Sequence, residues 1–113
     1  MVELLDIESF ITGTTTRTAK YEGAPYGSQT SFFLVDNQPG QGPGLHWHPY
    51  PETWVVLEGR VRFVAGRDEF EAVQGAITTV PAEMPHKFTN VGEGRLRMFC
   101  IHPSPTIIQH DLE

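Results

Sequence analysis

The sequence predicts an all-β protein, either a closed barrel or a double-sheet jelly roll of roughly eight to ten strands. Eleven glycines and nine prolines among 113 residues argue against long helices. Turn residues also recur at strand-length intervals, from Gly13 to the glycines at 92 and 94. Because this length suits one modest hydrophobic core, we expect residues 1–113 to form a single domain.

The expected strands follow one another with short turns between them. Ser31–Val35 and Thr53–Leu57 are rich in aromatic and β-branched residues. In Arg60–Val64, two apolar residues alternate with two arginines, which predicts one buried face and one face in solvent. Further strands are expected over 69–73, 76–80, 87–91 and 95–101. Only the first ten residues and the tail from 105 to 112 could form short helices.

Charge and cysteine content exclude several classes of function. The formal net charge is −6, from 8 basic and 14 acidic residues, so binding to nucleic acid or to anionic membranes is disfavoured. The single cysteine, Cys100, cannot form an internal disulfide, which fits a reducing compartment. The N-terminus lacks a secretory signal pattern, and no apolar run approaches the roughly 20 residues of a membrane span. We therefore expect a soluble, cytoplasmic protein.

Three histidines and one glutamate have a spacing that suits a metal site. His46 and His48 are two residues apart, so on a strand both imidazoles point to one face and Trp47 to the other. Glu52 follows a short proline-containing bend, and His86 begins a later strand. Imidazoles with one carboxylate suit Zn, Fe, Mn, Ni, Co or Cu better than Ca or Mg. An octahedral ion would keep one or two positions for water or substrate.

Two motifs resemble those of the cupin superfamily. The first joins a glycine, His-x-His, a glutamate and a second glycine, and it reads here as Gly40, His46, His48, Glu52 and Gly59. The second joins a glycine, Pro-x-Gly, a histidine and an asparagine, and it reads as Gly75, Pro81, Glu83, His86 and Asn90. The one departure is Glu83, which stands at a turn where the family usually has glycine.

This resemblance implies a cupin jelly-roll barrel in which His46, His48, Glu52 and His86 are the ligands of a divalent transition metal. It also implies a homodimer, often with N-terminal strands exchanged or packed across the interface. The departure at Glu83 removes no ligand, although it can alter the turn.

Several other residues have two readings from the sequence. Strand alternation places Trp54, Val56 and Phe88 inside the barrel, where they suit core packing more than substrate contact. Tyr50 either borders the entrance or is an exposed turn residue. Cys100 and His102 share one face of the last strand, and His102 either supports a metal-bound group or ends the strand in solvent. We expect His110 at the surface.

Two classes of function fit these features. The first is a metalloenzyme acting on a small molecule, of the dioxygenase, isomerase or lyase type that the resemblance allows. Its pocket would have an apolar wall formed by Trp54, Phe63, Met84 and Phe88, and no proton-transferring residue can be read from the sequence. The second is a non-catalytic module that binds a sugar or another small effector. The fold alone does not decide between them.

Overall fold

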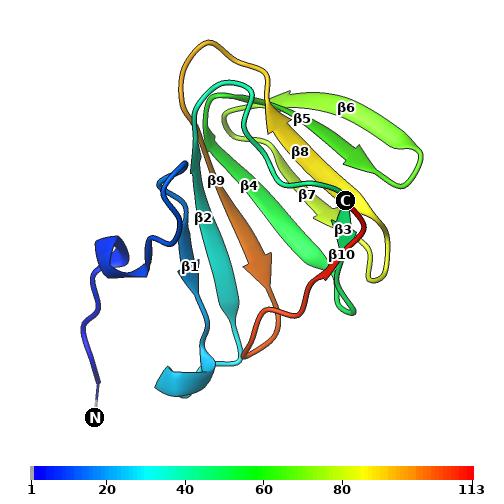
Figure 1. The fold of residues 1–113 in the computed structure, drawn as a ribbon. Coiled ribbons are helices and arrows are strands. Elements are labelled where there is room, and N and C mark those ends of the chain that lie inside the picture. Colours follow the sequence, from blue (N-terminus) through cyan, green and yellow to red (C-terminus); the bar gives the residue numbers. More distant parts are fainter. Residues whose placement is uncertain (1) are drawn as a thin grey trace.

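A computed structural model describes residues 2–113, and its ten strands form two antiparallel sheets (Figure 1). The first sheet has the order β1-β2-β9-β4-β7 and the second the order β10-β3-β8-β5-β6. The strands are β1 (Ala19–Tyr21), β2 (Ser31–Asn37), β3 (His46–Trp47), β4 (Glu52–Glu58), β5 (Arg60–Ala65), β6 (Asp68–Val73), β7 (Ile77–Val80), β8 (His86–Asn90), β9 (Leu96–His102) and β10 (His110–Asp111). The expected all-β jelly-roll class is confirmed.

Alternation of side chains separates a buried face from an outer face in both sheets. Along β9, every second residue from Leu96 to His102 is buried. In β5, Val61 and Phe63 are fully buried and the arginines on either side are exposed. Trp54 and Phe63 stack face to face, with ring centroids 4.3 Å apart, and join the two sheets in the core. The predicted burial of Trp54, Val56 and Phe88 is confirmed.

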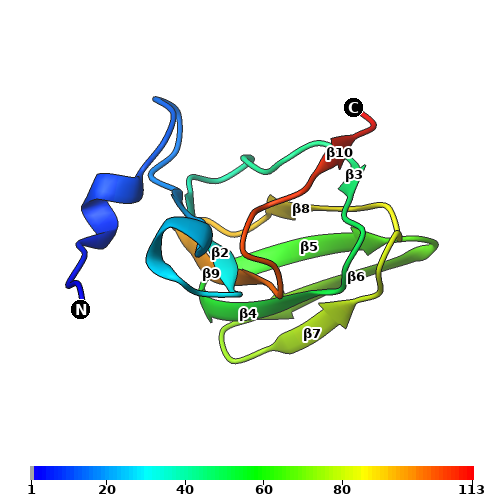
Figure 2. The same ribbon diagram turned by 90° about the horizontal axis from the view of Figure 1, so that it is seen from below.

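The two ends of the chain differ in how well the sequence predicts them. A short 3-10 helix, η1 (Ile7–Phe10), lies within the first ten residues as expected and lies outside the body of strands (Figure 2). A second, η2 (Ala24–Tyr26), occupies a turn between β1 and β2. The expectation of a helical tail is wrong, because the tail is extended and His110 and Asp111 pair with Trp47 and His46. In the described part of the chain no helix is long and apolar enough to span a membrane.

The outer faces of the two sheets have opposite character. On the first sheet, cross-strand pairs join Leu34 to Phe99, Phe99 to Val55, and Val55 to Ile77, so apolar side chains run across four strands. On the second sheet, Arg60 and Arg62 pair with Glu71 on the neighbouring strand at 2.8 and 3.1 Å. The outer face of the first sheet therefore carries a continuous apolar row, whereas the outer face of β5 and β6 carries ion pairs.

Candidate metal centre

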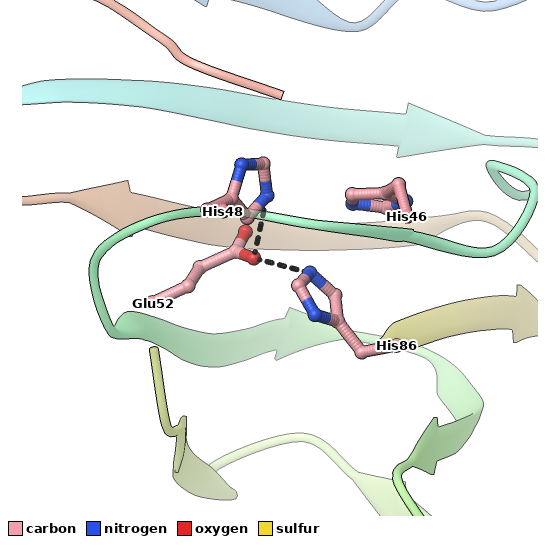
Figure 3. A group of neighbouring side chains, drawn as sticks. All are labelled: His46, His48, Glu52 and His86. Carbon is pink, nitrogen blue, oxygen red and sulfur yellow. Dashed lines mark ion pairs between the residues drawn. The ribbon is translucent and has the colours of Figure 1, made fainter. Parts of the chain in front are cut away.

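Four side chains from three strands and one loop converge inside the barrel. They are His46, His48, Glu52 and His86, all buried, with their nearest ligand atoms within 4.8 Å of one another (Figure 3). The structure thus brings together every residue that the sequence nominated for a metal. This group is able to hold a metal ion.

Backbone pairing explains why distant residues meet here. His46 on β3 lies directly opposite His86 on β8, and the two ring centroids are 4.4 Å apart. His48 follows the end of β3, where its carbonyl accepts the Glu83 N–H at 2.8 Å. Glu52 is the first residue of β4, so the bend between 48 and 52 returns the carboxylate to the same space. Trp47 points away from the site and stacks on His110.

Main-chain carbonyls fix the orientation of all three imidazoles. The Nδ1 atoms of His46, His48 and His86 lie 2.7, 2.7 and 2.8 Å from the carbonyl oxygens of residues 44, 108 and 84. A carbonyl can only accept, so each Nδ1 carries the proton and donates it. In the neutral ring, each Nε2 is then left with a free lone pair. Three such lone pairs belong to one site, which is the arrangement that a metal ion requires.

The donor atoms of this site have no adequate partner within the described protein. Glu52 Oε1 lies 2.9 Å from His86 Nε2 and 3.3 Å from His48 Nε2 (Figure 3). All three atoms are buried without a well-aligned hydrogen bond. If the rings are neutral, these contacts place lone pairs against an anionic oxygen, and unsatisfied buried polar atoms are costly. A divalent cation with nitrogen and oxygen ligands fits these residues and removes this conflict.

Charge and burial act in opposite directions on the ionisable groups of the site. Burial raises the pKa of Glu52, but His102, His48 and His86, which stabilise the anion when they donate a proton from Nε2, outweigh this and hold the pKa well below its ordinary value. Burial lowers the pKa of His46, and the neighbouring histidines add to that effect against the opposing contacts with Gly44 and Glu52. The structure therefore favours an ionised carboxylate beside a neutral imidazole, the protonation states that metal binding needs.

A second layer of contacts supports Glu52. Its other oxygen, Oε2, lies 3.2 Å from His102 Nε2, and His102 Nδ1 lies 2.6 Å from the hydroxyl of Tyr50. The Tyr50 hydroxyl in turn accepts the Ile108 N–H at 3.1 Å. Burial raises the pKa of Tyr50, which keeps the phenol protonated. Of the alternatives that the sequence left open, the structure buries His102 beside Glu52, although its Nε2 has no well-aligned hydrogen bond in the described structure. Tyr50 is hydrogen-bonded to His102 and Ile108.

A cavity of about 450 Å³ adjoins the site. Its lining includes His46, His48 and Glu52, together with Phe88 and Cys100. The predicted apolar wall is correct for Phe88 but wrong for its three other members, which do not line this cavity. Trp54 and Phe63 are committed to the core stack, and Met84 packs against the core from one side. Phe33 and Val35 on β2 take their place in the wall.

The motif residues that are not candidate ligands shape the backbone around the site. Glu83 has a φ of 67°, the one positive φ among the described non-glycine residues. This left-handed conformation is the reason that glycine suits the position.

Asn90 is buried and donates to the carbonyls of Asn37 and Gly94, while its own side-chain oxygen accepts the Gly92 N–H. It closes the turn between β8 and β9 and ties it to β2.

Comparison with known protein families gives a match over residues 33–102 to a family model described as the cupin domain. Among curated proteins, the chain is 39% identical over 75 residues to the polyketide synthase CurC of Streptomyces cyaneus, a match that covers 64% of this chain and 47% of that protein. It is 32% identical over 62 residues to the uncharacterized protein MJ1618 of Methanocaldococcus jannaschii, covering 54% and 50%. The chain spans about half the length of these curated relatives.

Solved structures share the fold at lower identity. An oxalate decarboxylase from Bacillus subtilis, studied for its Mn(II) centers, superimposes with a TM-score of 0.80 at 22% identity, covering 90% of this chain and 29% of that one. The formate complex of the Lactobacillus farciminis oxalate decarboxylase gives a TM-score of 0.78 at 21% identity, covering 89% and 32%. At these identities the likeness concerns the fold.

Proposed function

The chain belongs to the cupin domain family, and on this basis we propose that it is a metal-dependent enzyme acting on a small molecule inside the barrel. The proposed ligands are His46, His48, Glu52 and His86. The observation that carries the proposal is the set of three imidazoles whose Nδ1 atoms are bound by carbonyls, leaving three Nε2 atoms for one ion. The carbonyl contacts hold the rings with Nε2 free, which reduces the reorientation that binding of an ion would require.

The cavity beside the ligands supports an enzyme. A bound divalent metal supplies Lewis acidity, which polarises an oxygen of the substrate. His46 and Glu52 line the cavity, so a substrate bound there would lie next to the proposed metal ligands. Phe88 and Val35 exclude water from the same space, and His102 holds the carboxylate of Glu52 from behind. Reactions of the dioxygenase, isomerase and lyase types can all use an open metal beside a partly apolar pocket.

Elemental analysis of protein purified without a histidine tag or added metal tests the ligand set. We expect a transition metal at close to one equivalent per chain. The His48→Ala variant should lose it, whereas His110→Ala, which removes an exposed histidine stacked on Trp47, should retain it. Substoichiometric content of every transition metal in the wild type, or equal retention by both variants, would contradict the proposal.

Activity needs a separate test, because a metal site also serves non-catalytic binding modules. Oxygen uptake should be followed with Fe(II)-loaded protein and a panel of thiols, diketones and catechols, and mixtures should be analysed for isomerised or cleaved products. Conversion of any panel member supports an enzyme. A ligand that binds and is recovered unchanged would favour the alternative of a small-molecule sensor.

We further propose that the chain forms a homodimer through the apolar outer face of the first sheet. Ile77 is 69% exposed on the edge strand β7, beside Val55 and near Phe99. Apolar side chains that continue across strands in this way are characteristic of interaction surfaces. Light scattering should give a dimer for the wild type and for Val73→Glu, which alters an exposed valine on β6 of the other sheet. It should give a monomer for Ile77→Glu, and a monomeric wild type would refute the proposal.

A further inference from the structure

The charges around the cavity restrict what it can bind. Apart from the candidate ligands, Cys100 is the one ionisable side chain in the described lining, and no lysine or arginine contributes to it. Nearby arginines already have carboxylate partners on the outside of the barrel: Arg95 pairs with Asp36, and Arg17 with Glu8. A substrate with two negative charges would find no cationic side chain in the described cavity.

The metal site itself can balance little charge. A divalent ion together with the Glu52 carboxylate carries one net positive charge, since the three imidazoles bind as neutral ligands. One carboxylate or one ionised hydroxyl of a substrate can therefore be neutralised. A second carboxylate would find hydroxyl and amide groups in the described lining but no counter-ion, and burial of an unpaired charge is unfavourable.

The size and the lining indicate a larger and less polar molecule. A cavity of about 450 Å³ lies in the range of pockets for drug-sized ligands, of which a dicarboxylate such as oxalate would fill only a small part. Two phenylalanines supply flat apolar surface next to the ligands. The N-terminal segment and the β2–β3 region add hydroxyl and amide groups to the lining: Thr12, Thr15, Thr16, Thr18, Asn37 and Gln41.

We propose that the substrate is an uncharged or singly ionised oxygenated molecule with a flat apolar body, held by its oxygen atoms at the metal and by its body between Phe33 and Phe88. This inference rests on the proposed function, because it assigns a substrate class to the same site. The proposed substrate class differs from oxalate, the dicarboxylate named for the decarboxylases whose fold this chain shares.

Three probes test the inference on metal-loaded protein: 2,3-dihydroxynaphthalene, catechol and oxalate. Cobalt(II) loading is confirmed first by elemental analysis, and binding is then followed by the visible spectrum of the ion. We expect the naphthalenediol to bind at least about tenfold more tightly than catechol, which has the same chelating oxygens and one ring fewer to bury. Oxalate should bind most weakly. If cobalt fails to load, the proposed function fails; if it loads and oxalate binds as tightly as the naphthalenediol, the substrate class alone is wrong.

A variant with an added positive charge in the cavity tests whether the lack of a cationic side chain weakens oxalate binding. Gln41 lines the cavity, whereas Gln38 is exposed in the same loop and does not line it. Gln41→Arg should strengthen oxalate binding to the cobalt protein by up to about fivefold, the effect of one partly exposed ion pair. Gln38→Arg should leave it unchanged. Equal effects of the two variants, or none from either, would overturn the claim that missing positive charge excludes a dicarboxylate.

Discussion

The turn at Glu83 offers a substitution that should make the protein more stable. Residues Pro81 to Met84 form a tight turn in which the Met84 N–H approaches the Pro81 carbonyl, and Glu83 holds the third position with a φ of 67°. A turn with positive φ at this position favours glycine. For a residue with a Cβ atom, the left-handed conformation costs about 1–2 kcal/mol. The Glu83 side chain is exposed and makes no hydrogen bond or ion pair in the described structure.

Glu83→Gly should therefore raise the free energy of unfolding by about 1 kcal/mol, after allowance for the greater flexibility of glycine in the unfolded chain. For a domain of this size, that corresponds to an increase in Tm of about 4 °C. Urea titration and thermal unfolding of the metal-free protein measure both quantities. The Glu83 N–H still bonds to the His48 carbonyl in the variant, so metal content should be unchanged.

Ala82→Gly provides the matched control in the same turn. Ala82 is exposed and has a negative φ, so glycine there gains nothing in the folded state and adds freedom to the unfolded chain. This variant should be destabilised by about 0.5–1 kcal/mol. Shifts of the same sign in the two variants would refute the argument from backbone conformation.

Three further predictions concern the metal site and its surroundings. His102→Ala should lower metal affinity by about 10–100-fold through the loss of support for Glu52, measured by competition with a chromophoric chelator; unchanged affinity would remove that role. Burial lowers the pKa of His46, so as pH falls below about 6.5 the unfolded chain takes up a proton before the folded one. The free energy of unfolding of the metal-free protein should therefore decrease in this range. The metal affinity should decrease as well, because a protonated imidazole cannot bind a metal. Stability that rises between about pH 6.5 and 5 would contradict this sign. Burial and the nearby Glu52 carboxylate raise the pKa of the Cys100 thiol, so Ellman's reagent should react slowly at about pH 8 in native protein and rapidly in urea; fast reaction in both would show that the thiol is accessible.

The sequence predicts the grouping of the candidate ligands well because strand alternation and backbone pairing are simple geometric rules. The spacing of His46 and His48 predicts two imidazoles on one face. The resemblance to the cupin motifs adds His86, and the pairing of β3 with β8 brings it opposite His46. The alternation rule also shows that His102 shares a face with Cys100, but it leaves open whether that face is the inner one. The rule cannot reveal the role of Tyr50, because the direction of a side chain in an irregular bend depends on contacts with a tail 58 residues away.

The cavity wall is harder to predict for a related reason. In β2, Phe32 and Phe33 are both aromatic, so their alternation does not show which one faces inward. The threonines at the cavity come mostly from a segment without regular structure, where no periodicity applies. Trp54 and Phe63 lie inside the barrel as expected, but direction alone does not say whether an inward side chain reaches the cavity or fills the core. The pairing of β10 with β3 involves only two residues of each strand and leaves no pattern to detect.

The carbonyls that orient the imidazoles have a consequence for how this site can diverge. They belong to residues 44, 84 and 108, and the side chains at 84 and 108 take no part in the contact. Sequence drift at Met84 and Ile108 therefore leaves the three ring orientations intact as long as the main chain keeps its path. The neighbours of Glu52, by contrast, are side chains: His102 lies 3.2 Å from its Oε2 and Tyr50 bonds to His102, and a single codon change can remove either. Related chains can thus keep the orientation of the three histidines while the surroundings of the carboxylate, and with them its pKa, change.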